Sequence, residues 1–154
     1  EDIMRTNVIG AMATVDAAVA LFLRAGGGQV VGISSVAAFR GLPGSAAYSA
    51  SKAAISTYLE GVRAEVEPAG IAVTTISPGY IDTPINQDQK SRPFLITPEE
   101  GARQIADLVA RKVRQSTVPV LPWGAIGTLM RLLPDPIWYR AVASGPAKRA
   151  AERD

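Results

Sequence analysis

Residues 29–77 read as a strand, a helix and a second strand, and this order restricts the fold more than any other feature. Residues 29–34 are rich in β-branched side chains, residues 46–66 are rich in alanine, and residues 71–77 are again β-branched. The helix is predicted to stop at Glu67-Pro68-Ala69-Gly70. Two strands joined through a helix of this length pair in parallel with a right-handed crossover. The segment therefore predicts an α/β fold built on a parallel sheet.

Two further helices and a third strand are expected around this unit. Residues 1–25 carry apolar side chains at three- and four-residue spacing, which is typical of an amphipathic helix. Residues 97–114 begin with a threonine, a proline and two glutamates, a strong helix start. Residues 117–121 are expected to form the third parallel strand. The polar, irregular residues 84–96 favour a mobile flap.

The glycines at 26–28 do not indicate a phosphate-binding loop. A dinucleotide-binding fingerprint follows a strand and opens a helix, whereas these glycines end a helix and precede a strand. They are expected to form a helix C-cap and a turn. No Gly-x-Gly-x-x-Gly pattern occurs in the sequence.

Tyr48 and Lys52 are the pair on which a chemical function can be based. They lie four residues apart, so on the predicted helix they share one face. A free phenol with a pKa near ~10 is a poor acid or base at neutral pH, and an ammonium one turn away stabilises the phenolate and lowers that pKa. Ser35, at the end of the first strand, can hold a carbonyl or carbinol oxygen. These residues predict proton transfer, and a hydride carrier is needed to complete a redox reaction.

A turn at the end of the second strand is a candidate ligand site. Pro78, Gly79, Ile81 and Thr83 follow residues 71–77, and α/β folds bind ligands at the carboxyl ends of parallel strands. Backbone groups of this turn can meet a flat amide, and Thr83 can reach a phosphate. Taken alone, the residues are equally consistent with an ordinary turn. Asn7, on the first helix, is by itself consistent with a surface asparagine.

Composition excludes several classes of site and partner. The 154 residues contain no cysteine and no histidine, which removes disulfides, thiol nucleophiles, histidine-based triads and the common zinc sites. No metal site is therefore predicted. Net charge is +2 with no long basic run, so no nucleic-acid partner is expected, and the basic tail at Lys148, Arg149 and Arg153 is interpreted as a solvated end.

The sequence also carries an expectation about location. No apolar run was expected to reach the ~18 residues of a membrane span, and no secretory signal is recognisable. The prediction is therefore a chain without a transmembrane segment, in the cytoplasm. Residues 123–142 are apolar and broken by Pro134-Asp135-Pro136. They are consistent with a cover over the sheet, a subunit interface, a pocket wall or, less well, contact with a membrane surface.

Taken together, the motifs resemble the C-terminal part of the short-chain dehydrogenases/reductases of the simple type. The resemblance spans most of the chain, in the family's order and spacing. It is carried by Asn7 with Gly10, Ile33-Ser34-Ser35, Tyr48-Ser49-Ala50-Ser51-Lys52, and Pro78-Gly79 with Thr83.

The resemblance implies a role for each catalytic candidate. Tyr48 would be the proton donor or acceptor for the substrate oxygen, and Lys52 would lower the tyrosine's pKa and bind the nicotinamide ribose. Ser35 would orient the substrate oxygen. Asn7 would hold a water that links Lys52 to a proton relay.

The resemblance also implies a cofactor and partners. The cofactor would be NAD or NADP, with Pro78, Gly79 and Ile81 lining the nicotinamide and Thr83 meeting its amide or the phosphates. The substrate would be a carbonyl/alcohol pair, and the apolar residues 123–142 favour a hydrophobic ketone or alcohol. A homodimer or homotetramer is expected through the first two helices.

The sequence departs from the family in one large respect. The glycine-rich phosphate loop, the adenosine-binding strands and the residue that selects NAD or NADP are not in the chain. Residues 1–154 are therefore expected to be the C-terminal catalytic portion of one Rossmann-type domain, a fragment of a longer protein. The alternative is a catalytically inactive fragment that serves as an interaction or oligomerisation module.

Overall fold

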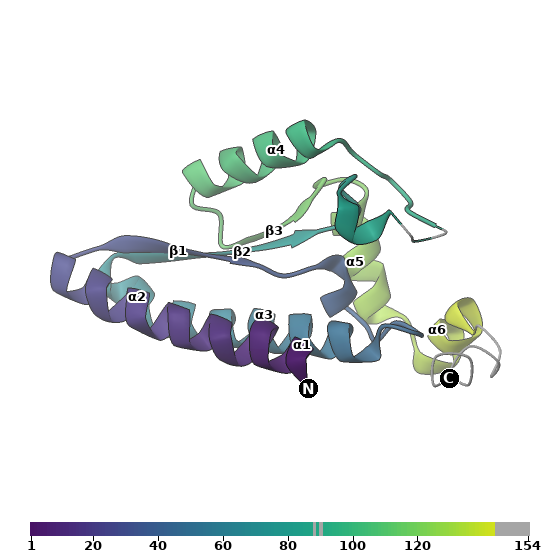
Figure 1. The fold of residues 1–154 in the computed structure, drawn as a ribbon, viewed down its shortest axis with the longest axis horizontal. Helices are drawn as coiled ribbons and strands as arrows, with labels where there is room; N and C mark the ends of the chain where they lie inside the picture. Colours follow the sequence, from purple (N-terminus) through teal and green to yellow (C-terminus); the bar gives the residue numbers. More distant parts are fainter. Residues whose placement is uncertain (88, 90, 144–154) are drawn as a thin grey trace.

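The computed structural model describes residues 1–87, 89 and 91–143, so the predicted basic tail and positions 88 and 90 of the flap lie outside the described residues. The chain alternates helices and strands around one sheet (Figure 1). The elements are α1 (Asp2–Met4), the π-helical turn η1 (Arg5–Gly10), α2 (Ala11–Ala25), β1 (Gly28–Ile33), η2 (Val36–Ala38), α3 (Ala46–Val66), η3 (Glu67–Ala69), β2 (Ile71–Pro78), η4 (Pro84–Asn86), α4 (Pro98–Ala110), β3 (Gln115–Val118), α5 (Trp123–Leu132) and α6 (Asp135–Val142).

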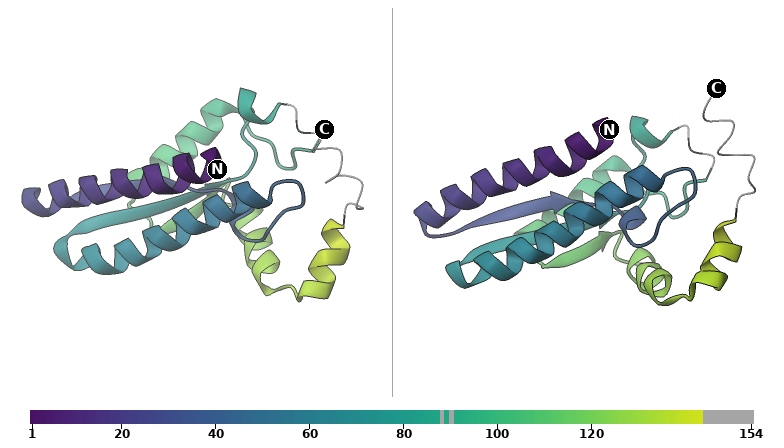
Figure 2. Two further views of the ribbon diagram at one scale, coloured as in Figure 1. Left: turned by 60° about the horizontal axis from the view of Figure 1, so that its bottom comes forward. Right: turned by 90° about the horizontal axis from the view of Figure 1, so that it is seen from below.

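The predicted α/β class and parallel sheet are confirmed. The three strands lie in the order β1-β2-β3, and both neighbouring pairs are parallel. Helices α2 and α3 lie on one face of the sheet and α4 on the other, as Figures 1 and 2 show. Parallel pairing brings the carboxyl ends of β1 and β2 side by side, since Ile33 is the register partner of Ile76.

Two predicted boundaries were wrong. The third strand is Gln115–Val118 rather than 117–121, because Pro119 has no amide hydrogen to donate to the ladder. Helix α4 ends at Ala110 rather than near residue 114. Its end is set by Lys112, whose φ of 51° is left-handed and cannot continue a helix. The predicted threonine N-cap is present, since the Thr97 hydroxyl accepts a hydrogen bond from the Glu100 amide.

The first helix runs without a break through α1, η1 and α2. Its end confirms the predicted glycine cap: Gly26 has a φ of 77°, and the amides of Gly26 and Gly27 both donate to the carbonyl of Phe22. By length and composition, Asp2–Ala25 is also apolar enough to cross a membrane, with a mean hydropathy of 1.7. The expectation that no stretch reaches that length was therefore wrong, because alanines extend the apolar run between the larger side chains.

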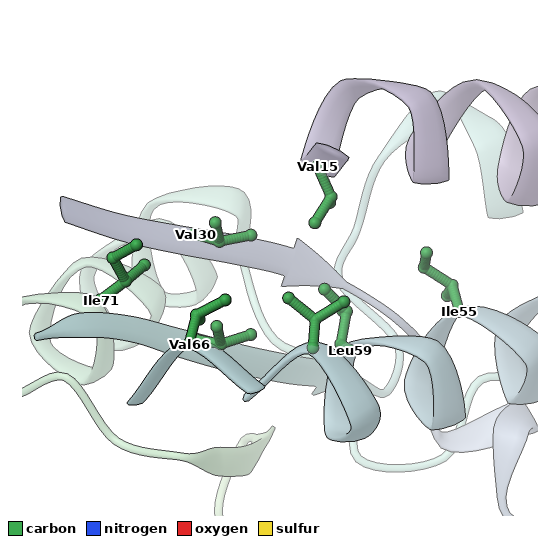
Figure 3. Packing of buried hydrophobic residues seen from close by; sticks show 8 residues of the cluster. Val15, Val30, Ile55, Leu59, Val66 and Ile71 are labelled. Carbon is green, nitrogen blue, oxygen red and sulfur yellow. The ribbon is translucent and has the colours of Figure 1, made fainter. Parts of the chain in front are cut away.

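The same helix has a packing role in the structure. Val15 of α2 is buried in the main core cluster with residues of β1, α3 and β2 (Figure 3). A helix of a soluble core and a signal sequence pass the same length test, so hydropathy does not fix where the protein resides. The cytoplasmic location stays a prediction.

Strand β1 is buried on one face only. Val30 faces α2 and α3 and is buried, whereas Val31 and Ile33 are 38% and 47% exposed. The reason is that α4 packs beside β3, over the Ile76–Val118 part of the sheet, and no described helix covers that face of β1. β1 is an edge strand of the described sheet.

The packing of α3 on β1 depends on Leu59 and Gly32. Leu59 is fully buried, and a Cβ placed on Gly32 would lie 2.1 Å from its Cδ1. We expect Leu59→Ala to lower the free energy of unfolding by about 2–5 kcal/mol, since it removes buried methyl groups and leaves a cavity. Urea unfolding measures this. Leu21→Ala on α2 is the matched control, because Leu21 is 58% exposed; equal losses in the two variants would contradict the packing.

Candidate active site

The candidate residues of the two strand ends lie on loops that neighbour each other. Ser34 and Ser35 follow β1, and Pro78 is the last residue of β2. The amide of Ser34 donates to the carbonyl of Ile76, which extends the β1–β2 ladder past the end of β1. The residues that follow β1 and β2 therefore lie side by side at the carboxyl edge of the sheet.

Lys52 reaches from α3 to the end of β1. Its Nζ donates to the carbonyl of Ile33 at 3.0 Å and lies 5.8 Å from the centre of the Tyr48 ring. This places an ammonium within the range of a cation–π contact with the phenol ring. Lys52 is half-buried, and that burial lowers its pKa from the ordinary value of 10.5.

Two serines, at 34 and 56, hold the backbone of the helix at Lys52. The hydroxyls of Ser34 and Ser56 lie 3.0 and 2.9 Å from the Lys52 carbonyl oxygen and 2.6 Å from each other. The two hydroxyl groups share their hydrogens among these three short contacts. The contacts hold α3 against the end of β1 at Lys52. Sequence analysis missed this role. The signal available was the four-residue spacing of Lys52 and Ser56.

Asn7 contacts the helix between Tyr48 and Lys52. Its Nδ2 donates to Ser51 Oγ at 3.1 Å, and Ser51 Oγ donates to the Tyr48 carbonyl at 2.8 Å. Asn7 lies in the π-helical turn η1, a local widening of the helix that is frequent at functional sites. Asn7 is half-buried and is bonded to α3 through Ser51. Its part in a water relay stays a prediction.

Ser35 is buried and caps the short helix η2. Its Oγ accepts a hydrogen bond from the amide of Ala37 at 3.1 Å. That bond uses a lone pair, so the hydroxyl hydrogen remains able to donate to another oxygen. Among the described residues, no hydrogen bond joins Ser35 to Tyr48.

The turn after β2 is packed under an aromatic cluster. A Cβ on Gly79 would lie 2.1 Å from Trp123 Nε1, so only glycine allows this approach. Trp123 also contacts Tyr80 and Phe94, with ring centres 6.2 and 5.6 Å apart. Its indole nitrogen is buried and has no hydrogen-bond partner among the described residues. Sequence analysis placed Gly79 at the site but did not predict its partner.

The base of the flap is tied to the same turn. The backbones of Ile81 and Ile96 form an isolated parallel bridge, and Arg92 makes an ion pair with Asp82. Thr83 Oγ1 donates to the Ile81 carbonyl at 3.3 Å, so this hydroxyl is turned toward its own backbone. Contact of Ile81 and Thr83 with a cofactor stays a prediction. No cluster of three or more metal-ligating side chains occurs in the described part of the chain.

Comparison with known proteins fits this geometry. Residues 1–93 match the family model described as short chain dehydrogenase. The chain belongs to the short-chain dehydrogenase family. It is 37% identical to an uncharacterised oxidoreductase of Myxococcus xanthus over 142 residues, which are 90% of this chain and 55% of the relative. An uncharacterised oxidoreductase of Mycobacterium tuberculosis is 33% identical over 85% of this chain and 52% of its own length.

Solved short-chain dehydrogenases share the fold. A short-chain dehydrogenase from Burkholderia cenocepacia, in complex with NADP, matches with a TM-score of 0.77 at 23% identity over 92% of this chain and 58% of its own. One from Mycobacterium paratuberculosis, bound to NAD, matches with a TM-score of 0.63 at 26% identity over 74% of this chain and 52% of its own. The short-chain dehydrogenase described here spans about half the length of the curated relatives it matches.

Proposed function

We propose that this chain carries the catalytic residues of an NAD(P)-dependent oxidoreductase that acts on a carbonyl/alcohol pair. The observation that carries the proposal is the position of Lys52, whose ammonium is fixed to the end of β1 beside the Tyr48 ring. Family membership and the NAD- and NADP-bound structures of similar proteins support it.

Tyr48 is the general acid in the reduction and the general base in the oxidation. In the reduction, the phenol O–H bond breaks as the substrate oxygen takes its proton, and the ammonium of Lys52 stabilises the phenolate that forms. Ser35 donates its free hydroxyl hydrogen to the same substrate oxygen. When bound, the nicotinamide supplies the hydride that the carbonyl carbon accepts, or accepts one from the alcohol carbon.

The residues present fit a nicotinamide nucleotide at this edge of the sheet. The Lys52 ammonium has three N–H donors and uses one on Ile33, which leaves two for ribose hydroxyls. Pro78, Gly79 and Ile81 lie at the end of β2 and would line the nicotinamide. The Thr83 hydroxyl would turn away from the Ile81 carbonyl to contact the nicotinamide's carboxamide or the cofactor's phosphates. Tyr80 and Phe94, which pack on the buried Trp123, make the neighbouring surface aromatic, and this favours a hydrophobic substrate.

Subunit contact through α2 and α3 is part of the proposal. The open groove between these helices is lined by Asp16 of α2 and by residues of α3, and four of the α3 residues are small enough to allow close approach of a second pair of helices. They are Ala50, Ala53, Ala54 and Gly61. A homodimer or homotetramer would use this face. The same groove supports the alternative of an interaction module. That alternative, however, does not explain why Ser35, Tyr48 and Lys52 occur together.

Binding of reduced cofactor by the native polypeptide separates the two functions. An intact mass near 16.1 kDa would show that the chain acts alone, and a larger mass would show that further residues accompany it. The protein of that verified mass is then titrated with NADH and with NADPH, and the cofactor fluorescence is followed. We expect saturable binding of at least one of the two. Failure of both would reject the oxidoreductase and leave the interaction module.

A further inference from the structure

The last two helices of the described residues form an arm across the carboxyl edge of the sheet. This C-terminal arm, α5 and α6, leaves the end of β3 and passes beside the loop between β1 and α3 (Figures 1 and 2). That loop connects Ser35 to Tyr48, so it carries two of the proposed catalytic residues at its ends. The contacts between arm and loop are concentrated on two loop residues, Phe39 and Arg40.

Arg40 binds the arm through both terminal nitrogens of its guanidinium. Its Nη1 donates to the carbonyls of Met130 and Leu133 at 3.2 and 2.9 Å, and its Nη2 donates to the carboxylate of Asp135 at 2.6 Å. The guanidinium also lies 5.2 Å from the centre of the buried Trp138 ring. The side chain of Arg40 is only 18% exposed. One residue therefore binds the end of α5, the start of α6 and the aromatic ring that follows.

Phe39 adds a second attachment beside Arg40. A Cβ on Gly127 of α5 would lie 2.3 Å from the Phe39 ring, so the helix touches the ring through its backbone. The guanidinium of Arg131 stacks on the same ring, 4.4 Å from its centre. The loop and the arm thus interlock from both sides: an arginine of the loop binds the arm, and an arginine of the arm binds the loop.

The other end of the arm is fixed at the turn after β2. Trp123, the first residue of α5, covers Gly79 and contacts Phe94 of the flap. The arm therefore spans from the proposed nicotinamide turn to the loop between Ser35 and Tyr48. An arm attached at both places restrains the distance between those two parts of the site.

We propose that Arg40 is a positioning residue that joins the C-terminal arm to the loop between Ser35 and Tyr48. Through Arg40, the arm and the loop stabilise each other's position. A fork of N–H donors aimed at two carbonyls and a carboxylate fits arginine and no other side chain. The catalytic consequence rests on the proposed function: loss of Arg40 would loosen Ser35 and Tyr48 without touching Lys52. The structural coupling does not depend on that function.

Hydrogen exchange on the full-length native protein tests the coupling without a substrate. The amides of Ala37, Ala38 and Phe39 are bonded within the loop, and those of Ile137 and Trp138 within the arm. Arg40→Met is expected to speed exchange at least tenfold in both segments and to leave α4 unchanged. Asp135→Ala changes only the arm, yet it should also speed exchange of the loop amides. Arg40→Lys keeps the charge but loses the forked arrangement of N–H donors. Its exchange rates should lie between those of the wild type and Arg40→Met.

Arg103→Met is the matched control, because Arg103 is exposed on α4 and makes no ion pair with a described residue. Arg103→Met should leave the exchange rates of both the loop and the arm unchanged. Unchanged loop exchange in Asp135→Ala, or in Arg40→Met, would overturn the coupling.

Turnover of a panel of aliphatic and aromatic ketones with NADH and NADPH gives the catalytic readout. Arg40→Met should lower kcat at least tenfold and leave the dissociation constant of the cofactor within twofold of wild type. Unchanged kcat would overturn the positioning role. If the wild-type protein neither binds a reduced cofactor nor reduces any ketone, the proposed function fails, and the exchange experiment still decides the coupling.

Discussion

Tyr48→Phe is expected to lower kcat by about 10²–10⁴-fold, the usual contribution of a positioned general acid or base. In the proposed reaction the substrate oxygen takes the phenol hydrogen, and phenylalanine has none to give. The ring itself remains beside the Lys52 ammonium, so the affinity for cofactor should change little. Steady-state turnover and fluorescence titration of the cofactor, on the same preparations, measure the two effects separately.

Tyr58→Phe is the matched control, since it removes the same hydroxyl from the same helix. Tyr58 hydrogen-bonds Asp16 on α2, away from the strand ends. Burial, together with the Asp16 carboxylate, raises the pKa of Tyr58 to about 12, so this phenol stays protonated in the working pH range. The control should keep wild-type kcat. Substantial activity in Tyr48→Phe, or equal losses in both variants, would refute the role of Tyr48.

Local sequence signals predicted the parts of the fold that depend on neighbouring residues. Helix α3 has the predicted bounds, because an alanine-rich run and a Pro-Gly stop determine it without help from distant residues. The cap at Gly26 was predicted for the same reason. Strand β3 was shifted, because its limits depend on which β2 groups it pairs with and on Pro119. The one-sided burial of β1 depends on which helix covers which face, and periodicity carries no such information.

In the candidate site, too, only the placement of residues within and between neighbouring elements could be predicted. Spacing along one helix placed Tyr48 beside Lys52, and strand order placed both near the end of β1. Contacts around the site also join residues that are far apart in the chain: Ser34 bonds the carbonyl of Lys52, 18 residues on, and Arg40 bonds Asp135, 95 residues on. No pattern within a single element indicates such pairs. Residues that hold catalytic groups in place are therefore harder to predict than the groups themselves.

The second large effect is expected from Lys52→Ala, which should weaken cofactor binding as well as turnover. A hydrogen bond from a charged donor contributes about 1.5–3 kcal/mol, so loss of a bond to the ribose should raise the dissociation constant roughly 10- to 100-fold. The rate should fall as well, because the phenolate of Tyr48 loses its stabilising charge. Lys112→Ala, which removes an exposed lysine after α4, is the control. Retained cofactor affinity in Lys52→Ala would argue against a ribose contact.

The pH dependence of cofactor affinity gives a sharper test of the same residue. Burial lowers the pKa of Lys52 below 10.5, so the protonated form, which carries the charge and all three donors, is lost as pH rises through that lowered value. Wild-type affinity should therefore decline on the alkaline side before an ordinary lysine would titrate. The Lys52→Ala variant should lack this alkaline decline, whereas Lys112→Ala should keep it. A decline that persists in Lys52→Ala would assign the titration to another group, because alanine has no proton to lose.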